Sequence, residues 1–207
     1  MPKIKKTKNA LKSQRDSMSR FERFLPTLEL KKQQLQAEVR HVDVAIRQKA
    51  AEEEAFQQRL RAWVKLFSAD LEASGLAMAD LVRLTEVRRS MGNIAGVNVP
   101  TFEEAVFARA PIDYFATPSW LEDAAEVLEC LMRLRAERLI LEDQRRLLGE
   151  ELRITSQRVN LFEKVKIPEC KENIRVIRIA LGDAQTAGVA RAKMAKGKAG
   201  DLASAVT

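Results

Sequence analysis

The feature that most constrains this chain is a seven-residue apolar repeat near its N-terminus. Alternating steps of three and four residues from Leu11 to Phe67 reach seventeen positions, and thirteen of them are apolar. A lone helix has no reason to keep this period for about eight heptads, whereas a helix that packs along a second helix requires it. As a helix, the segment is about 85 Å long, which exceeds what a compact domain of this size needs. The apolar seam positions are Leu11, Met18, Phe21, Leu25, Leu28, Leu35, Val39, Val42, Ile46, Phe56, Leu60, Trp63 and Phe67.

Charged residues and a proline interrupt this repeat. Lys32, Lys49 and Glu53 occupy seam positions, which suits a helix whose outer surface also meets other proteins. Pro26 lies inside the pattern, and a proline within a helix costs about 3 kcal/mol because it lacks the amide proton and its ring clashes with the preceding turn. A break into two helices at Pro26 is one interpretation. The heptad phase continues across it, which favours a single kinked but continuous helix.

A second long helical segment is predicted from Trp120 onward. Ser119 before it and Glu122 and Asp123 in its first turn are typical of a helix start. After Pro168 the apolar phase moves, and a four-residue stutter describes the shift. The predicted seam positions of this segment are Leu131, Leu134, Leu141, Leu148, Leu152, Val159, Phe162, Ile174, Ile177 and Leu181.

The residues between the two helical segments carry turn and strand signals. Glycines and prolines punctuate this stretch, and β-branched residues lie between them. A short helix over Met78–Val82 fits this pattern, and short strands or a β-hairpin around Ile94–Val99 and Val106–Phe107 fit best. The stretch is too small for a doubly wound fold, so we interpret it as a small head.

Two heptad helices joined by such a connector can fold back on each other. Each then buries a face that it could not bury alone. Full burial of a large apolar side chain stabilises the folded chain by about 1.5–3 kcal/mol. We therefore predict an all-α dominated chain, with a long antiparallel two-helix coiled-coil hairpin and a small α/β head. The expected organisation is an N-terminal helix with a basic tail over 1–67, the head over 68–119, and a C-terminal helix with a basic Ala/Lys/Gly tail over 120–207.

Charge is distributed unevenly along the chain. The 36 basic and 29 acidic residues give a net charge of +7. Residues 1–15 hold six basic residues and no acid, whereas residues 99–130 hold seven acids against Arg109. Basic ends could bind phosphates, so a basic nucleic-acid-binding rod is one alternative function. Residues 1–20 and 163–207 contain no aromatic side chain on which a base could stack, which disfavours that alternative.

No pattern in the sequence predicts an active site. There is no glycine-rich loop followed by Lys-Ser or Lys-Thr to hold phosphates. His41 is the single histidine, and it has neither metal ligands at suitable spacing nor a nucleophile beside it. On one helix, Cys130 and Cys170 would be about 60 Å apart and could not form a disulfide. We therefore expect no catalytic residue, no cofactor and no bound metal.

The sequence also lacks a membrane-spanning segment. Its longest uncharged stretch, Ser90–Phe102, has thirteen residues, whereas a spanning helix needs about 20 apolar residues. Lysines run through Met1–Lys12 and no apolar run follows them, so no signal peptide is predicted. We expect a soluble, cytosolic protein.

One short motif points to a known family. Residues 158–168 contain Arg158, Val159, Asn160, Glu163, Ile167 and Pro168, and this pattern resembles the C-terminal helix of the D subunit of the V/A-type (vacuolar/archaeal-type) ATPases. Residues 28–35 and 94–100 are similar to the N-terminal helix and the connector of that family. The resemblance covers nearly the whole chain in the right order. The chain departs from the family at Gln33 and Gln34, where Arg-Asp is usual, and in its C-terminal tail.

The resemblance implies the central rotor stalk of a rotary ATPase. Family members place both termini inside the hexamer of A and B subunits, and they bind the small F subunit and a socket subunit of the membrane sector. The D subunit has no ATP site and is not an enzyme by itself. It couples ATP hydrolysis or synthesis to ion translocation, and it is cytoplasmic and peripheral to the cell membrane through the complex. The alternative from another class is a free-standing coiled-coil scaffold.

Overall fold

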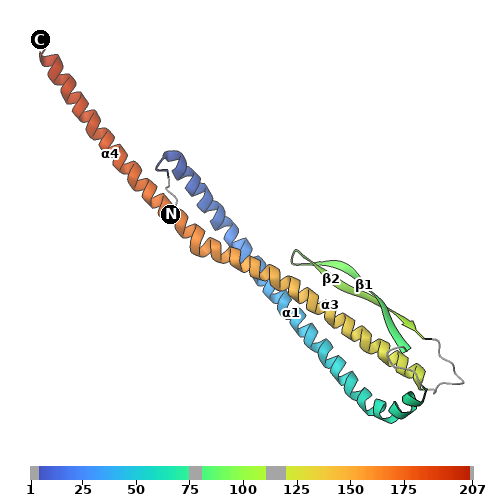
Figure 1. Ribbon diagram of the computed structural model, residues 1–207. Coiled ribbons are helices and arrows are strands. Elements are labelled where there is room, and N and C mark those ends of the chain that lie inside the picture. The colour runs from blue at the N-terminus through green and yellow to red at the C-terminus, as the bar shows by residue number, and fades with distance from the viewer. Residues whose placement is uncertain (1–4, 75–80, 111–119, 206–207) are drawn as a thin grey trace. The chain divides into compact units, whose positions relative to one another are not determined.

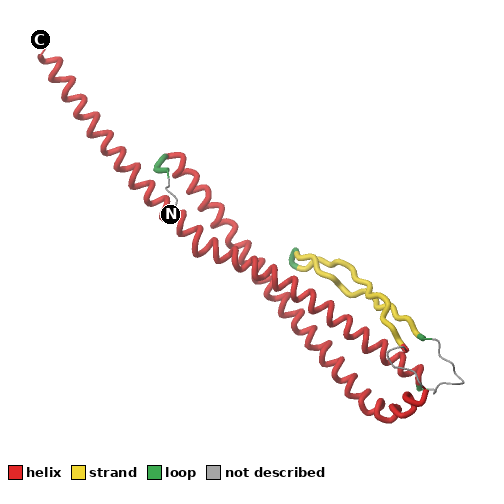
Figure 2. Tube along the Cα trace, viewed as in Figure 1, coloured by secondary structure: helices red, strands yellow, loops and turns green. Residues whose placement is uncertain are grey.

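The computed structural model describes the backbone of residues 5–74, 81–110 and 120–205, and the side chains of these ranges apart from 62–74 and 199–205. The elements in chain order are α1 (Lys8–Ser74), β1 (Val82–Ile94), β2 (Val97–Arg109), α3 (Leu121–Leu161), a π-helical turn (Phe162–Lys166) and α4 (Ile167–Ala205). Figures 1 and 2 show long helices and one two-stranded hairpin, so the predicted fold class is confirmed.

The described structure divides into two compact units. One unit contains residues 1–30 and 155–207, and the other contains residues 31–154. Each unit therefore combines part of α1 with part of the second helical stretch. We call them the terminal unit and the hairpin unit, and we describe each by itself.

Helix α1 begins with a side-chain cap and runs through its proline. The amide of Ala10 donates a hydrogen bond to Thr7 Oγ1 over 3.2 Å, which satisfies one of the free amides of the first turn. Pro26 lies inside the continuous helix and is exposed. The carbonyl of Glu22, which the missing amide would have satisfied, belongs to an exposed residue that water can reach. The interpretation as two separate helices is thus wrong, and a continuous helix is confirmed.

The two strands pair in antiparallel register, from Val82 opposite Arg109 to Ile94 opposite Val97. Ala95 and Gly96 form the turn, with φ angles of 51° and 78°, which is typical of a type I′ hairpin turn. The side chain of Asn93 accepts a hydrogen bond from the Gly96 amide over 3.1 Å. The register shifts twice, between Leu84 and Glu86 and between Arg88 and Arg89.

The strand bounds predicted from the sequence were wrong. The expected strand Ile94–Val99 contains the turn, and each observed strand has thirteen residues. β-Branched residues lie on both sides of the turn, so they looked like one continuous strand in the sequence. Alanine seldom adopts a positive φ, so Ala95 did not indicate a turn. Of the short helix expected over Met78–Val82, residues 78–80 lie outside the described part, Leu81 is helical, and Val82 begins β1.

In the hairpin unit, α1 and α3 run antiparallel and the hairpin packs on both. Lys31 of α1 pairs with Glu151 of α3, whereas Lys49 pairs with Glu137. The tip cluster joins α1, β2 and α3 through the buried side chains of Leu35, Val42, Val99 and Leu148. The base cluster consists of Leu81, Val82, Leu121, Ala124 and Ala125. These two clusters hold the hairpin against α3, and Figure 1 shows the two strands beside that helix.

In the terminal unit, α1 packs against the π-helical turn and α4. The rings of Phe21 and Phe162 have centroids 5.0 Å apart and are tilted by 46°. The side chains of Gln14 and Asn173 are joined by a 3.4 Å hydrogen bond. The two helical segments are antiparallel here too, because Gln14, which precedes Phe21 in α1, meets Asn173, which follows Phe162.

Candidate functional site

The predicted seam side chains of α1 are buried or half-buried wherever the structure describes them. Leu35 and Val42 are buried, and none of the others whose side chains are described is exposed. Trp63 and Phe67 lie outside the described side chains. The half-buried positions are Leu11, Met18, Phe21, Leu25, Leu28, Val39, Ile46, Phe56 and Leu60.

The second helical stretch shows the same pattern. Its buried seam positions are Leu148, Val159, Ile174 and Ile177. The half-buried ones are Leu131, Leu134, Leu141, Leu152, Phe162 and Leu181. The two sets of seam residues meet within each unit, as in the tip cluster of the hairpin unit and the Phe21–Phe162 contact of the terminal unit.

Two charged seam residues are paired across the helices. Lys49 Nζ lies 2.9 Å from Glu137 of α3 and 3.2 Å from Glu52 of its own helix. The hydrogen bond to Glu137 raises the pKa of Lys49 above its ordinary value. The ammonium of this seam lysine thus bridges α1 and α3 in the hairpin unit.

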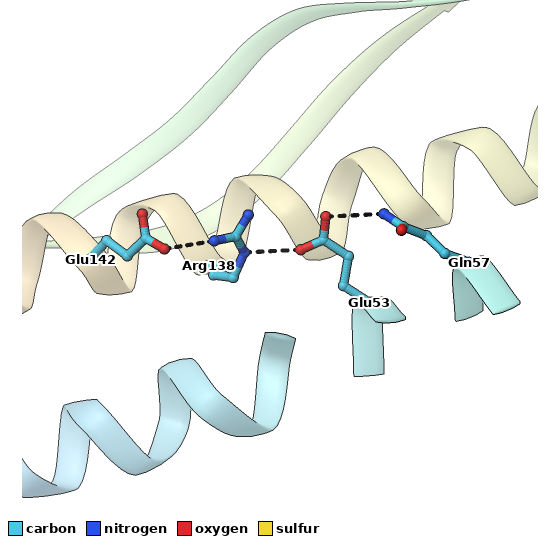
Figure 3. A network of polar contacts seen from close by, with 4 residues as sticks. All are labelled: Glu53, Gln57, Arg138 and Glu142. Carbon is cyan, nitrogen blue, oxygen red and sulfur yellow. Dashed lines mark hydrogen bonds and ion pairs between the residues drawn. The ribbon is translucent and has the colours of Figure 1, made fainter. Parts of the chain in front are cut away.

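Glu53 belongs to a larger polar network in the same unit (Figure 3). Arg138 of α3 donates one hydrogen bond to Glu53 over 2.9 Å and another to Glu142 over 2.7 Å. Gln57 donates to the second oxygen of Glu53 over 3.5 Å. The side chains of Glu53 and Arg138 are only 12% and 25% exposed, so solvent screens this pair less than a surface pair. The network ties α1 to α3 at a point where the seam has no apolar residue.

The hairpin is held by polar contacts that sequence reasoning missed. The side chain of Gln144, which is buried, donates a 2.6 Å hydrogen bond to the main-chain carbonyl of Pro100. Near the other end of the hairpin, Arg109 donates two hydrogen bonds to Glu129, over 2.6 and 3.0 Å. These bonds lower the pKa of the Glu129 carboxyl. No local signal identifies Gln144, because its partner is a carbonyl 44 residues away.

The family-like motif divides into a buried part and an exposed part. Val159 and Ile167 are buried in the terminal unit. Arg158, Asn160, Glu163 and Pro168 are exposed. The π-helical turn lies inside the motif, and the Ile167 amide donates to the Phe162 carbonyl, five residues back. Such turns are frequent at functional sites, and the exposed motif residues are therefore the candidate contact surface of this unit.

The described residues hold no group of three or more His, Cys, Asp or Glu side chains that could bind a metal ion. His41 is exposed. Cys130 is exposed, whereas Cys170 is buried, and its burial raises the pKa of the thiol. Within the described part of the chain, no helix is long and apolar enough to span a membrane.

Comparison with known proteins decides the family. The profile of the family described as the D subunit of ATP synthase matches residues 10–197. The chain belongs to the ATP synthase D-subunit family. It is 43% identical over 196 residues to the V-type ATP synthase D subunit of Borreliella burgdorferi, covering 95% of each chain. It is 34% identical over 195 residues to the protein of the same name from Chlamydia caviae, covering 94% of this chain and 93% of the relative.

The residues matched by the family profile include nearly all of the elements described above. The match includes the seam of α1, the hairpin, the charged network around Arg138 and the motif at the π-helical turn. The resemblance inferred from residues 158–168 is therefore confirmed.

Proposed function

We propose that this chain is the central rotor shaft of a rotary V/A-type ATPase. In this role it transmits torque between a hexamer of A and B subunits and the ion-translocating membrane sector, without catalysing a reaction. The observation that carries the proposal is the antiparallel helix pairing found separately in each unit of a D-subunit family member. Relatives of this chain are named as the D subunit of V-type ATP synthase.

A shaft must resist twisting, and the contacts of the hairpin unit favour such stiffness. Apolar side chains from α1, β2 and α3 interlock in the tip cluster. Ion pairs join α1 to α3 at Lys31, Asp43, Lys49 and Glu53. Slippage of one helix along the other would have to separate these pairs and expose the cluster, so both kinds of contact oppose it.

The terminal unit has a different polar surface, which suits contact with a changing partner. In the part of this unit that the structure describes, no ion pair links α1 to the second helical stretch. Its seam uses apolar side chains and the Gln14–Asn173 hydrogen bond. Arg158 and Glu163 are exposed. Because no ion pair across the helices in the described part of this unit engages them, their charges are available to other proteins.

Rotation follows if the catalytic states prefer different faces of one rigid body. Each nucleotide state of an A/B pair would bind a different side of the shaft, and hydrolysis would change which state each pair adopts. The same coupling works in reverse when ion flow turns the shaft. The proposed partners are the A and B subunits, the small F subunit and a socket subunit of the membrane sector. The chain would reach the cytoplasmic side of the cell membrane through these partners.

A rotation assay on the purified ATPase complex tests the proposal. The head is fixed to a surface through its A or B subunits, and a bead is attached to the exposed thiol of Cys130. We expect ATP to drive stepwise rotation of the bead in one direction. A Cys130→Ser complex, which should carry no bead, controls for labelling at other sites. A bead that stays fixed while the complex hydrolyses ATP would make the chain a static scaffold.

A further inference from the structure

An apolar groove runs between β1 and α3 in the hairpin unit. It is an open cavity of about 540 Å³, to which β1 contributes Leu84 and Val87 and α3 contributes Met132, Leu139 and Ile140. Leu84 is 37% exposed and Leu139 is 52% exposed. The groove lies outside the α1–α3 seam, because its lining comes only from β1 and α3.

The charges at the rim of this groove do not cancel. Arg89 of β1 and Arg135 of α3 line it, and both are exposed. Neither arginine forms an ion pair with any residue that the structure describes. The acids of the rim, in contrast, are engaged: Glu142 pairs with Arg138, and Asp143 is 3.5 Å from Arg146. The groove thus offers an apolar floor and two uncompensated guanidinium groups.

We propose that this groove binds an acidic amphipathic helix of another protein. Apolar residues at helical spacing would lie on Leu84 and Leu139, and carboxylates on the same helix would pair with Arg89 and Arg135. A docked strand fits less well, because the register shift between Leu84 and Glu86 distorts β1 where a third strand would pair. The proposal concerns a surface of the chain itself and does not depend on the rotor role.

The first experiment identifies what covers the groove. Photoreactive p-benzoylphenylalanine replaces Leu139 in the full chain, and the chain is irradiated in cells and purified through a tag. The matched control has the same probe in place of Cys130. Nine residues, or about two and a half helical turns, separate the two positions, so the control probe points away from the groove.

We expect the probe at Leu139, but not the one at Cys130, to cross-link to a single protein segment. That segment should have apolar residues at helical spacing and at least two acidic residues. The proposal is overturned by absence of a cross-link, by equal capture at both positions, or by capture of a segment without carboxylates. Capture of a second copy of this chain, or of nucleic acid, also overturns it.

The second experiment measures the binding of a synthetic peptide with the captured sequence to the purified full chain. Arg89→Glu and Arg135→Glu should each weaken binding about three- to fivefold at low salt. The control Arg40→Glu makes the same charge change at an exposed position of α1 and should change binding less than twofold. If the control weakens binding as much as the groove variants do, only net charge matters and the proposal fails.

A third pair of variants tests the apolar floor with the same peptide. Leu139→Asp should weaken binding about tenfold, because a leucine that is half exposed in the free chain would be buried in the complex. The control Val44→Asp places the same charge at a valine that is equally exposed, 51% against 52%. Far-ultraviolet circular dichroism checks that both variants are folded. Equal binding by the two variants would refute the docking site.

Discussion

Truncation of Leu35 to alanine tests the central packing of the hairpin unit. Leu35 is fully buried and belongs to the tip cluster with Val42 of the same helix, Val99 of β2 and Leu148 of α3. The substitution removes atoms from a cluster to which three elements contribute, while alanine remains compatible with the helix. Any loss of stability therefore reports on packing rather than on helix propensity.

The size of the effect follows from the burial of Leu35. Removal of a buried leucine side chain to Cβ costs about 2–5 kcal/mol, because it loses transfer free energy and leaves a cavity. We expect about 3 kcal/mol for Leu35→Ala, since the cluster is packed by rigid elements on several sides. For a chain of this length, that corresponds to a fall in the melting temperature of about 6–12 °C.

Leu30→Ala is the matched control on the same helix. Leu30 is 57% exposed, so its truncation should cost less than about 1 kcal/mol. Urea unfolding followed by far-ultraviolet circular dichroism compares both variants with the parent chain at constant m-value. If Leu35→Ala destabilised the chain no more than Leu30→Ala, the tip cluster would not be a packed core and the arrangement of α1, β2 and α3 would be refuted.

Three further predictions concern charge, pH and thiol chemistry. Glu53→Gln, which removes the acid that pairs with Arg138 across the helices in Figure 3, should cost about 1–3 kcal/mol in urea unfolding, and an unchanged midpoint would contradict the network. Because Arg109 lowers the pKa of Glu129, the stability from this pair is present above about pH 4.3 and is lost as pH falls through the folded-state pKa. The difference between the parent and Glu129→Gln should therefore be larger at pH 7 than at pH 3, and a constant difference would refute the pair. Cys130 should react with a thiol reagent in the native chain, whereas Cys170, which is buried, should react only after unfolding; equal rates would contradict its burial.

The helices could be predicted from the sequence because their signals are local. The seven-residue repeat of α1 depends only on neighbouring turns, and it continues across Pro26 because the lost hydrogen bond faces solvent. The partners of the charged seam residues could not be predicted in the same way. Arg138 meets Glu53 across 85 residues of sequence, so the pair depends on the register between two helices, which no local pattern fixes.

The hairpin illustrates a second limit of sequence reasoning. Its existence followed from glycines and β-branched residues, but its turn at Ala95 requires an alanine at positive φ. The hydrogen bond from Asn93 to the Gly96 amide supports this turn, and such a side-chain contact is visible only after the strands are paired. The buried Gln144 is a similar case, because its role depends on the Pro100 carbonyl and not on its neighbours.

The motif around the π-helical turn also has a structural explanation. Steps of three and four residues from the buried Val159 would next reach residues 162, 166, 169, 173 and 176. The buried residues are instead Ile167, Cys170, Ile174 and Ile177, so the seam advances by one residue beyond Phe162. The Ile167 amide bonds to a carbonyl five residues back instead of four, and this adds one residue to the turn.

Pro168 explains why the extra residue is placed there. A proline at this position cannot donate to the carbonyl of Lys164, and its ring would crowd that carbonyl in a regular α-helix. A wider turn immediately before it relieves this conflict, and the turn ends at Lys166. Val159 and Ile167 are thus the buried residues on either side of a shift in helical phase, and Pro168 favours that shift. The one-residue insertion, rather than a four-residue stutter, returns the seam of α4 to the face that packs on α1 in the terminal unit.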